Sequence, residues 1–281
     1  MVSITVGNDL IPVTSSPGRA RRAMSAVGGG LRFGFRNLVA VAIVFGLWEV
    51  LPRLGLISRT FVPPFSTVCV AWWQLLVHGP LLADMGASLE RSLIGFGLAL
   101  AICIPLGLFL GWYPRLARFL NPVIELFRNT AALALLPVFI LTLGIGQVSK
   151  IAVILYACAW PILLNTISGV RSVDPLLVKS ARSIGLPPIK LFQKVFLPAA
   201  LPTIFTGIRL AGAVSILVLL AAEIQGATSG LGFLINTAQT NFQIPQMYAG
   251  ILTISVIGLV FNQVLVQLER HFSSWRGSPG Q

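Results

Sequence analysis

The chain has 281 residues, of which 56% are hydrophobic and only 10% are charged. Soluble domains carry roughly a quarter charged residues, so this composition excludes an ordinary soluble domain and predicts a membrane protein. The net charge of +12 comes from 20 Lys and Arg against 8 Asp and Glu. Because these basic residues lie in short gaps between apolar runs, membrane orientation explains them better than binding to nucleic acid.

Six stretches of the chain are candidates to cross a membrane, which takes about 20 mostly apolar residues. In chain order they are Leu38–Ile57, Ser92–Tyr113, Thr130–Leu143, Ile151–Val170, Ile204–Ala222 and Met247–Val266. The third is short and contains Pro137. Ser66–Val77 is also apolar but shorter still, and is predicted to lie in the membrane interface, where its two tryptophans suit the headgroup depth.

The segments around these spans are polar. Residues 1–36 form a basic, Gly-rich cytoplasmic segment that we expect to be disordered. Residues 37–268 are expected to form the transmembrane domain, with a cytoplasmic hairpin at 171–203, and residues 269–281 a short cytoplasmic tail.

The basic residues also predict the orientation of the spans. If the N-terminus is cytoplasmic, 16 of the 20 Lys and Arg fall on the cytoplasmic side. Only Arg53, Arg59, Arg91 and Lys150 remain outside. This asymmetry follows the positive-inside rule. The sequence therefore predicts a multi-pass protein of the inner (plasma) membrane with both termini in the cytoplasm.

The longest cytoplasmic loop, residues 171–203, contains the signals for two short helices. Asp174 can cap a helix that begins with Pro175. Gly185 is the expected left-handed stop, and two prolines follow it. A second helix is predicted over Ile189–Phe196 and is expected to end at Pro198. The loop is therefore predicted to be a helix–turn–helix hairpin beneath the membrane.

The chain contains no GxxxxGK[ST] phosphate-binding loop and no GxGxxG fingerprint. A protein without these motifs does not bind ATP by such means. An ordered cytoplasmic hairpin on such a protein suggests a docking surface for a separate ATP-driven motor.

The hairpin also resembles a known motif. The order Lys179-Ser180-Ala181, three residues, Gly185, nine residues, Val195-Phe196-Leu197-Pro198 is similar to E-A-A-x3-G-x9-I-x-L-P, the EAA motif of ABC importer permeases. The spacing is kept throughout, whereas Lys179, Ser180 and Val195 depart from the Glu, Ala and Ile of the motif.

This resemblance implies an all-α membrane protein of about six transmembrane helices, with the type I ABC importer permease (MetI-like) fold. In that family the hairpin is the coupling helix that sits in a groove of the ATPase. The positions implied to couple to the ATPase are Asp174, Lys179, Ser180, Ala181, Arg182, Gly185, Leu197 and Pro198. The implied partners are a second copy of the chain, two ATPase subunits and an extracytoplasmic solute-binding protein, within membrane lipid and without nucleic acid.

Several other stretches are similar to the sulfonate/nitrate/taurine branch of these permeases. They are Trp48-Glu49, Val62–Ser66, Ser88–Gly97, Leu143–Ile151, Gly169–Asp174, Ala222-Glu223 and Gly230–Gly232. One departure occurs after Arg128, where Ala131 replaces the proline usual in that branch. The resemblance implies import of a small oxyanion such as a sulfonate or nitrate. A neutral heterocyclic nutrient, such as a vitamin precursor, is the alternative.

Three ionisable residues are candidates for the translocation path or its gate: Glu223, Arg128 and Glu49. A carboxylate near membrane depth is costly and usually faces protein or water, so Glu223 lines the path or forms a structural hydrogen bond to a neighbouring helix. For Glu49, pairing with Arg53 one turn later is favoured. Small-residue pairs, Gly107 with Gly111 and Gly207 with Ala211, would permit close helix approach.

Two other classes of membrane protein would require different sequence patterns. An ion-coupled secondary transporter predicts paired ionisable groups at mid-membrane and an inverted repeat. An intramembrane enzyme needs a catalytic set within its spans. The sequence shows neither pattern, nor any cofactor or metal-ligand spacing, so a transport subunit without enzymatic activity of its own is predicted.

Overall fold

The computed structural model describes residue 39 and residues 42–273, and these residues contain helices and turns but no strand. The chain divides into two compact units, residues 1–65 and residues 66–281. The predicted basic segment 1–36 and residues 274–281 of the predicted tail lie outside the described residues.

In the first unit, residues 42–53 are helical, so the described part of the first predicted span confirms a helix there. Trp48 donates its indole N–H to the carbonyl of Pro63 over 3.1 Å. The rings of Phe45 and Trp48 also pack on Phe65, with centroids 4.7 and 5.5 Å away. Glu49 forms an ion pair with Arg53 one turn later, which confirms the predicted pairing.

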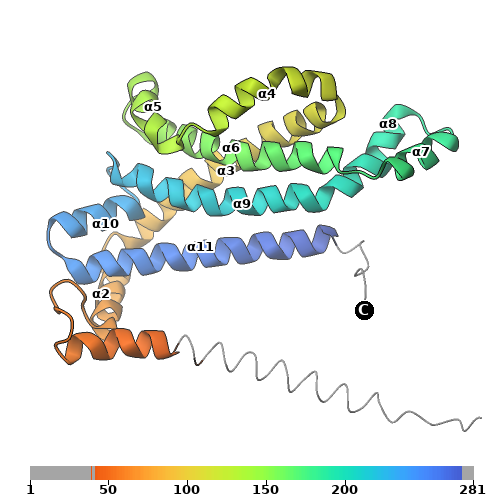
Figure 1. The fold of residues 1–281 in the computed structure, drawn as a ribbon. Helices are drawn as coiled ribbons and strands as arrows, with labels where there is room; N and C mark the ends of the chain where they lie inside the picture. The colour runs from red at the N-terminus through yellow and green to blue at the C-terminus, as the bar shows by residue number, and fades with distance from the viewer. Residues whose placement is uncertain (1–38, 40–41, 274–281) are drawn as a thin grey trace, which may run out of the picture. The chain divides into compact units, whose positions relative to one another are not determined.

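The second unit contains four helices that are long and apolar enough to cross a membrane (Figure 1). They are α3 (Leu81–Trp112), α6 (Gln147–Arg171), α9 (Leu197–Ile224) and α11 (Ile244–Ser273). Each corresponds to a predicted span and begins earlier in the chain than predicted.

The third predicted span differs from the prediction. Helix α4 (Pro114–Arg128) is followed by the 3₁₀ turn η1 (Ala132–Leu135) and by α5 (Leu136–Leu143). Together α4 and the η1–α5 segment are long and apolar enough for one span, but they are bent by 80° at the break between them. The break lies at Ala131, whose backbone is extended (φ −63°, ψ 122°). The helix therefore breaks at the position of the expected proline although the residue is alanine.

Two shorter helices complete this unit, α2 (Phe65–Val77) and α10 (Leu231–Thr240). With 13 residues, α2 is too short to cross a bilayer by itself. Trp72 on α2 donates its indole N–H to the Thr253 hydroxyl of α11 over 3.0 Å. The placement of α2 in the interface stays a prediction.

Helices α3, α6 and α9 pack closely because glycines line their contacts. A Cβ atom added at Gly107 would lie 2.6 Å from Thr166 of α6, and one at Gly111 would lie 2.6 Å from Val170. At Gly207 of α9 the nearest side chain, again on α6, would also be 2.6 Å away. Real Cβ atoms do not approach so closely, so these positions require glycine. The predicted close approach of helices is confirmed.

The hairpin between α6 and α9 consists of α7 (Pro175–Ser183), α8 (Pro188–Leu191) and the π-helical turn η2 (Phe192–Phe196). The prediction that Pro198 ends the second helix is wrong. The helical path runs on through α9, because the wider π turn accommodates the proline. In a regular α-helix the ring of Pro198 would clash with the carbonyl of Lys194. Instead the N–H of Leu197 bonds to the carbonyl of Phe192, five residues back.

Candidate functional site

The start of α7 is fixed by a side-chain cap. One carboxylate oxygen of Asp174 accepts a hydrogen bond from the backbone N–H of Leu176 over 2.8 Å. Pro175 occupies the first helical position, where its missing N–H leaves no donor unsatisfied. The predicted cap is therefore confirmed.

The end of α7 is fixed by Gly185, which has φ +78°. The N–H of Gly185 bonds to the carbonyl of Arg182 over 2.9 Å, and the N–H of Leu186 bonds to that of Ala181 over 3.2 Å. These two bonds form a Schellman motif, which needs a left-handed residue at the position of the glycine. The predicted stop is confirmed, and the hairpin has a defined bend.

Much of the surface of the hairpin is exposed, and it is both apolar and basic. Leu176, Ile184 and Ile189 are 68%, 79% and 73% exposed. The predicted coupling residues Lys179, Ser180, Arg182 and Gly185 are exposed too, whereas Ala181 is buried and Leu197 is half-buried. Apolar side chains exposed to this extent on a short hairpin are typical of an interaction surface.

The inner surface of the hairpin is anchored to the spans. Val173 and Leu191 are buried. The indole of Trp112, at the end of α3, meets the rings of Phe192 and Phe196 edge-on, with centroids 5.2 and 4.9 Å apart. These contacts attach the hairpin to the bundle at both of its ends. A hollow of about 580 Å³ separates α7 from the ends of α3 and α6, and Lys179 and Arg182 are among its lining residues.

At the opposite ends of α6 and α9 lies a buried charge cluster. Arg91 of α3 and Glu223 of α9 form an ion pair of 2.6 Å, with side chains 4% and 0% exposed. The Arg91 guanidinium also donates to the backbone carbonyl and hydroxyl of Ser229 and to the side chain of Gln147, over 2.7 to 2.9 Å. A buried ion pair requires such additional partners to offset desolvation.

The same cluster holds the turn between α9 and the start of α10. The Glu223 carboxylate accepts from the Ser88 hydroxyl and from the N–H of Gly232 over 2.8 to 2.9 Å. Asp84 accepts from the N–H of Gly230 over 2.7 Å, and Ser88 accepts from the N–H of Leu231 over 2.8 Å. The first N–H groups of α10 are thus satisfied by α3 and α9.

Lys150 completes the cluster from the start of α6. Its ammonium donates to the carbonyls of Gly146 and Gly226 over 3.1 and 3.2 Å. The sequence prediction placed Arg91 and Lys150 together outside the membrane, and the structure brings them to one end of the bundle. The sequence prediction did not foresee that Arg91 and Lys150 would both be buried with Glu223. The available signal was Arg91 itself, the single arginine of the mostly apolar helix α3, because a charge in such a helix needs a buried partner.

Of the two roles predicted for Glu223, its contacts match the structural one, which is hydrogen bonding to neighbouring helices. Arg128 lies elsewhere, at the end of α4 beside the bend, and pairs over 2.6 Å with Glu125; both side chains are more than two-fifths exposed. Close to it, the Tyr156 hydroxyl donates to the Phe127 carbonyl over 2.5 Å. Within the described residues no cluster of His, Cys, Asp or Glu could hold a metal ion.

Comparison with known families agrees with this geometry. Residues 103–274 match the model of the family described as the inner membrane component of binding-protein-dependent transport systems. The chain is 34% identical to the putative aliphatic sulfonates transport permease SsuC of Bacillus subtilis (strain 168), across 89% of this chain and 91% of that protein.

Two further relatives are similar over most of their length. The taurine transport system permease TauC of Escherichia coli (strain K12) is 34% identical across 86% of this chain and 90% of its own. The nitrate import permease NrtB of Leptolyngbya laminosa is 29% identical across 89% and 94%. Among solved structures, a chain of the inward-facing MetNI methionine ABC transporter gives a TM-score of 0.60 at 18% identity, covering 70% of this chain and 98% of that one.

Proposed function

The chain belongs to the family of inner membrane components of binding-protein-dependent transport systems, so it is a transport permease and not an enzyme, and we propose that its α7–α8 hairpin couples it to a separate ATPase. Its fold is the all-α, MetI-like fold of type I ABC importer permeases. One observation supports the coupling role most directly. The hairpin exposes apolar and basic side chains, while Val173 and Leu191 are buried and the rings of Phe192 and Phe196 pack on Trp112 of α3.

Each predicted coupling residue has a distinct task in this proposal. Asp174 and Gly185 define the two ends of α7, and Ala181 packs it inward. Lys179, Ser180 and Arg182 offer polar groups to the ATPase. Leu197 and Pro198 join the hairpin to α9 through the π turn, so that a displacement of the hairpin reaches a membrane span.

The complete transporter in this proposal contains two copies of the chain, two ATPase subunits and an extracytoplasmic binding protein. The hairpin and both termini face the cytoplasm, because the basic residues are concentrated at that end. A cysteine introduced at Ser183 tests the orientation. It should react with a membrane-impermeant thiol reagent in inside-out vesicles and stay unlabelled in intact spheroplasts, measured against the chain without the added cysteine.

The proposed cargo is a small oxyanion such as a sulfonate or nitrate. The names of three relatives, for aliphatic sulfonates, taurine and nitrate, support this class. We propose that Arg128 lies along the path, because a cation beside a broken helix can meet an anion within the membrane. Glu223 and Glu49 are proposed to support the gate at the outer ends of their helices rather than to contact the anion.

The test is reconstitution of the chain into proteoliposomes with its ATPase and binding protein. Uptake of radiolabelled taurine, an alkanesulfonate or nitrate should require ATP and should persist when ion gradients are abolished. An ion-coupled carrier would show the reverse dependence, and this outcome would reject the proposal. Uptake of a neutral heterocycle but of none of these anions would reject the proposed cargo alone.

Arg128→Gln tests the path. It should lower uptake of the anion while ATP hydrolysis stimulated by the binding protein continues. Arg118→Gln is the matched control, since Arg118 is an exposed arginine on the same helix α4. Equal uptake by the two variants would show that Arg128 does not meet the cargo.

A further inference from the structure

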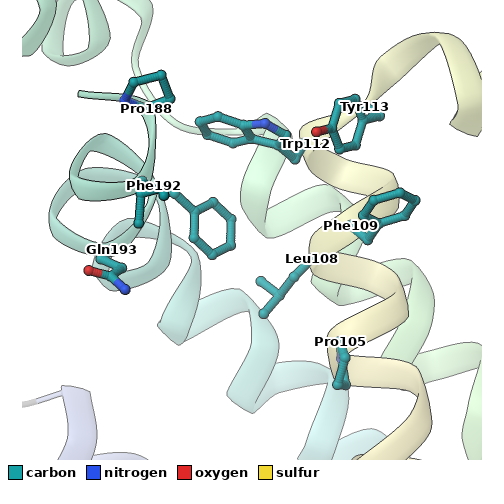
Figure 2. Close-up of a pocket in the computed structure, with 9 residues that line it drawn as sticks. Pro105, Leu108, Phe109, Trp112, Tyr113, Pro188, Phe192 and Gln193 are labelled. Atoms are coloured by element: carbon teal, nitrogen blue, oxygen red, sulfur yellow. The ribbon is translucent and has the colours of Figure 1, made fainter. Parts of the chain in front are cut away.

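A second hollow, lined almost entirely by apolar side chains, lies where α3 meets the α8–η2 segment. It has a volume of about 490 Å³. Figure 2 shows the Phe192 ring reaching toward α3, with Trp112 beside it and Pro105 further along the same helix. The rings of Phe109 and Tyr113, with centroids 4.9 Å apart, form the opposite wall. This apolar groove adjoins the hairpin surface proposed for coupling, with which it shares Ile189, and it does not include the residues of the buried charge cluster.

The groove is long enough to extend from the headgroups to the depth of the acyl chains. From Trp112 to Pro105 is seven residues of an α-helix, or about 10 Å at 1.5 Å per residue. Tryptophan and tyrosine favour the headgroup depth, so the Pro105 end lies at the depth of the acyl chains. The exposed face of α3 continues the groove along the helix with Leu98, Ile102 and Leu106, which are 43%, 52% and 42% exposed. A partner from the water phase would not fill the inner end.

The end of the groove nearest the hairpin and the start of α4 is strongly basic. Arg115 follows two residues after Tyr113 at the start of α4, and Lys190 follows Ile189 in α8; both are exposed. Lys179, Arg182 and Lys194 lie on the same hairpin segments. Within residues 105–119 and 174–196 the single acidic residue is Asp174, and its carboxylate caps α7. An occupant of the groove must therefore combine an apolar body with a negative charge.

We propose that the groove between α3 and the α8–η2 segment binds an anionic phospholipid, with an acyl chain against Phe109 and Phe192 and its phosphate between Arg115 and Lys190. Basic pockets between membrane helices near the surface suit such headgroups. The chain's own residues 1–36 fit poorly as an occupant, because they carry five arginines and one aspartate and would be repelled by the basic rim. The bound lipid would tie the coupling hairpin to the membrane surface.

Native mass spectrometry of the full chain in mild detergent tests the site, with phosphatidylglycerol or phosphatidylcholine added. Phosphatidylglycerol should remain bound and phosphatidylcholine should not. One basic residue near an anionic membrane surface contributes about 1 kcal/mol, which corresponds to about fivefold in affinity. Arg115→Gln and Lys190→Gln should each lower phosphatidylglycerol retention about fivefold. Arg270→Gln is the matched control, since Arg270 is exposed on α11 and does not line the groove.

A photoreactive phenylalanine analogue at position 109 identifies the occupant in vesicles of phosphatidylcholine that contain phosphatidylglycerol. The expected product is an adduct enriched in phosphatidylglycerol. The same analogue at position 259, which is exposed on α11 and does not line the groove, should label both lipids in proportion to their abundance. An adduct to a second copy of the chain or to the ATPase would overturn the proposal. Equal retention of both lipids, or retention that the two Gln variants leave unchanged, would also overturn it.

Discussion

Gly185 offers the sharpest test of the proposed coupling role of the hairpin, because its substitution strains the backbone while an added Cβ atom meets no neighbour. Its φ of +78° lies in the left-handed region, and a Cβ atom added there would meet nothing within 4 Å. A larger side chain thus causes backbone strain without a clash. Holding an L-residue other than glycine in that region costs roughly 1–2 kcal/mol. The bent conformation of the hairpin should therefore become less favourable by the same free energy.

A cost of this size corresponds to about 5- to 30-fold in the population of the correctly bent hairpin. Gly185→Leu should therefore lower ATP-driven transport by this factor in proteoliposomes that contain the ATPase and binding protein. Hydrolysis of ATP should fall much less, so that fewer molecules are transported per ATP. Gly185→Asn should retain most transport, because asparagine tolerates the left-handed conformation.

The control is Gly55→Ala, at a residue with φ +75° and equally open surroundings in the first unit of the chain. It introduces a similar strain away from the hairpin and should leave the ratio of transport to hydrolysis unchanged. The reasoning is refuted if Gly185→Leu transports at the rate of the unmodified chain, or if the Leu and Asn variants fall equally.

Three further predictions concern stability. Arg91→Met leaves the buried Glu223 carboxylate without its cation, so it should destabilise the protein by about 3–5 kcal/mol, measured by thermal unfolding in detergent. The Arg91→Met/Glu223→Met double variant should be more stable than Arg91→Met alone. A double variant less stable than Arg91→Met would contradict this reasoning. Gly107→Ala should lower the melting temperature, because its Cβ would lie 2.6 Å from an α6 side chain. Gly97→Ala is the control and should not lower it, because a Cβ there would meet nothing within 4 Å. Equal shifts in the melting temperatures of the two variants would argue against close packing at Gly107. Asp174→Ala should remove the cap of α7 at a cost of about 0.5–2 kcal/mol, and Asp174→Asn should retain most of it; limited proteolysis at the hairpin should be faster in the Ala variant only.

Local rules were sufficient to predict much of the fold. The hydrophobic runs located four spans, since the cost of placing backbone and charge in lipid leaves few alternatives to a long apolar helix. The hairpin ends at Asp174 and Gly185 were predictable because a cap and a left-handed stop depend on neighbouring residues alone. These features need no information about the rest of the chain.

Features that depend on tertiary packing were not predictable in the same way. The expectation that Pro198 ends a helix treats the chain as a regular α-helix, and the π turn Phe192–Phe196 avoids the clash. The burial of Arg91 with Glu223 joins residues 132 positions apart, and no local pattern specifies that pairing. The bend at Ala131 likewise lacks the proline that would have signalled it.

The two ends of the bundle are connected by one closely packed pair of helices. The hairpin joins the end of α6 to the start of α9, and these helices remain in contact along their length. A Cβ at Gly169 would lie 3.0 Å from the carbonyl of Ala200, and further along, the Cys158 thiol donates to the Ala211 carbonyl over 3.4 Å. At the far end Lys150 ties the two together through the carbonyl of Gly226.

A pair joined at both ends and packed through glycine has little freedom to shear, so we expect α6 and α9 to move as one body. Helix α6 has 25 residues, which places its two ends about 38 Å apart at 1.5 Å per residue. The weakest point of this body is the π turn Phe192–Phe196, where the hydrogen bonding is irregular and Pro198 supplies no N–H. We therefore expect a displacement of α7 to reach the buried charge cluster only if that turn resists bending. The ring contacts of Trp112 with Phe192 and Phe196 would provide this resistance.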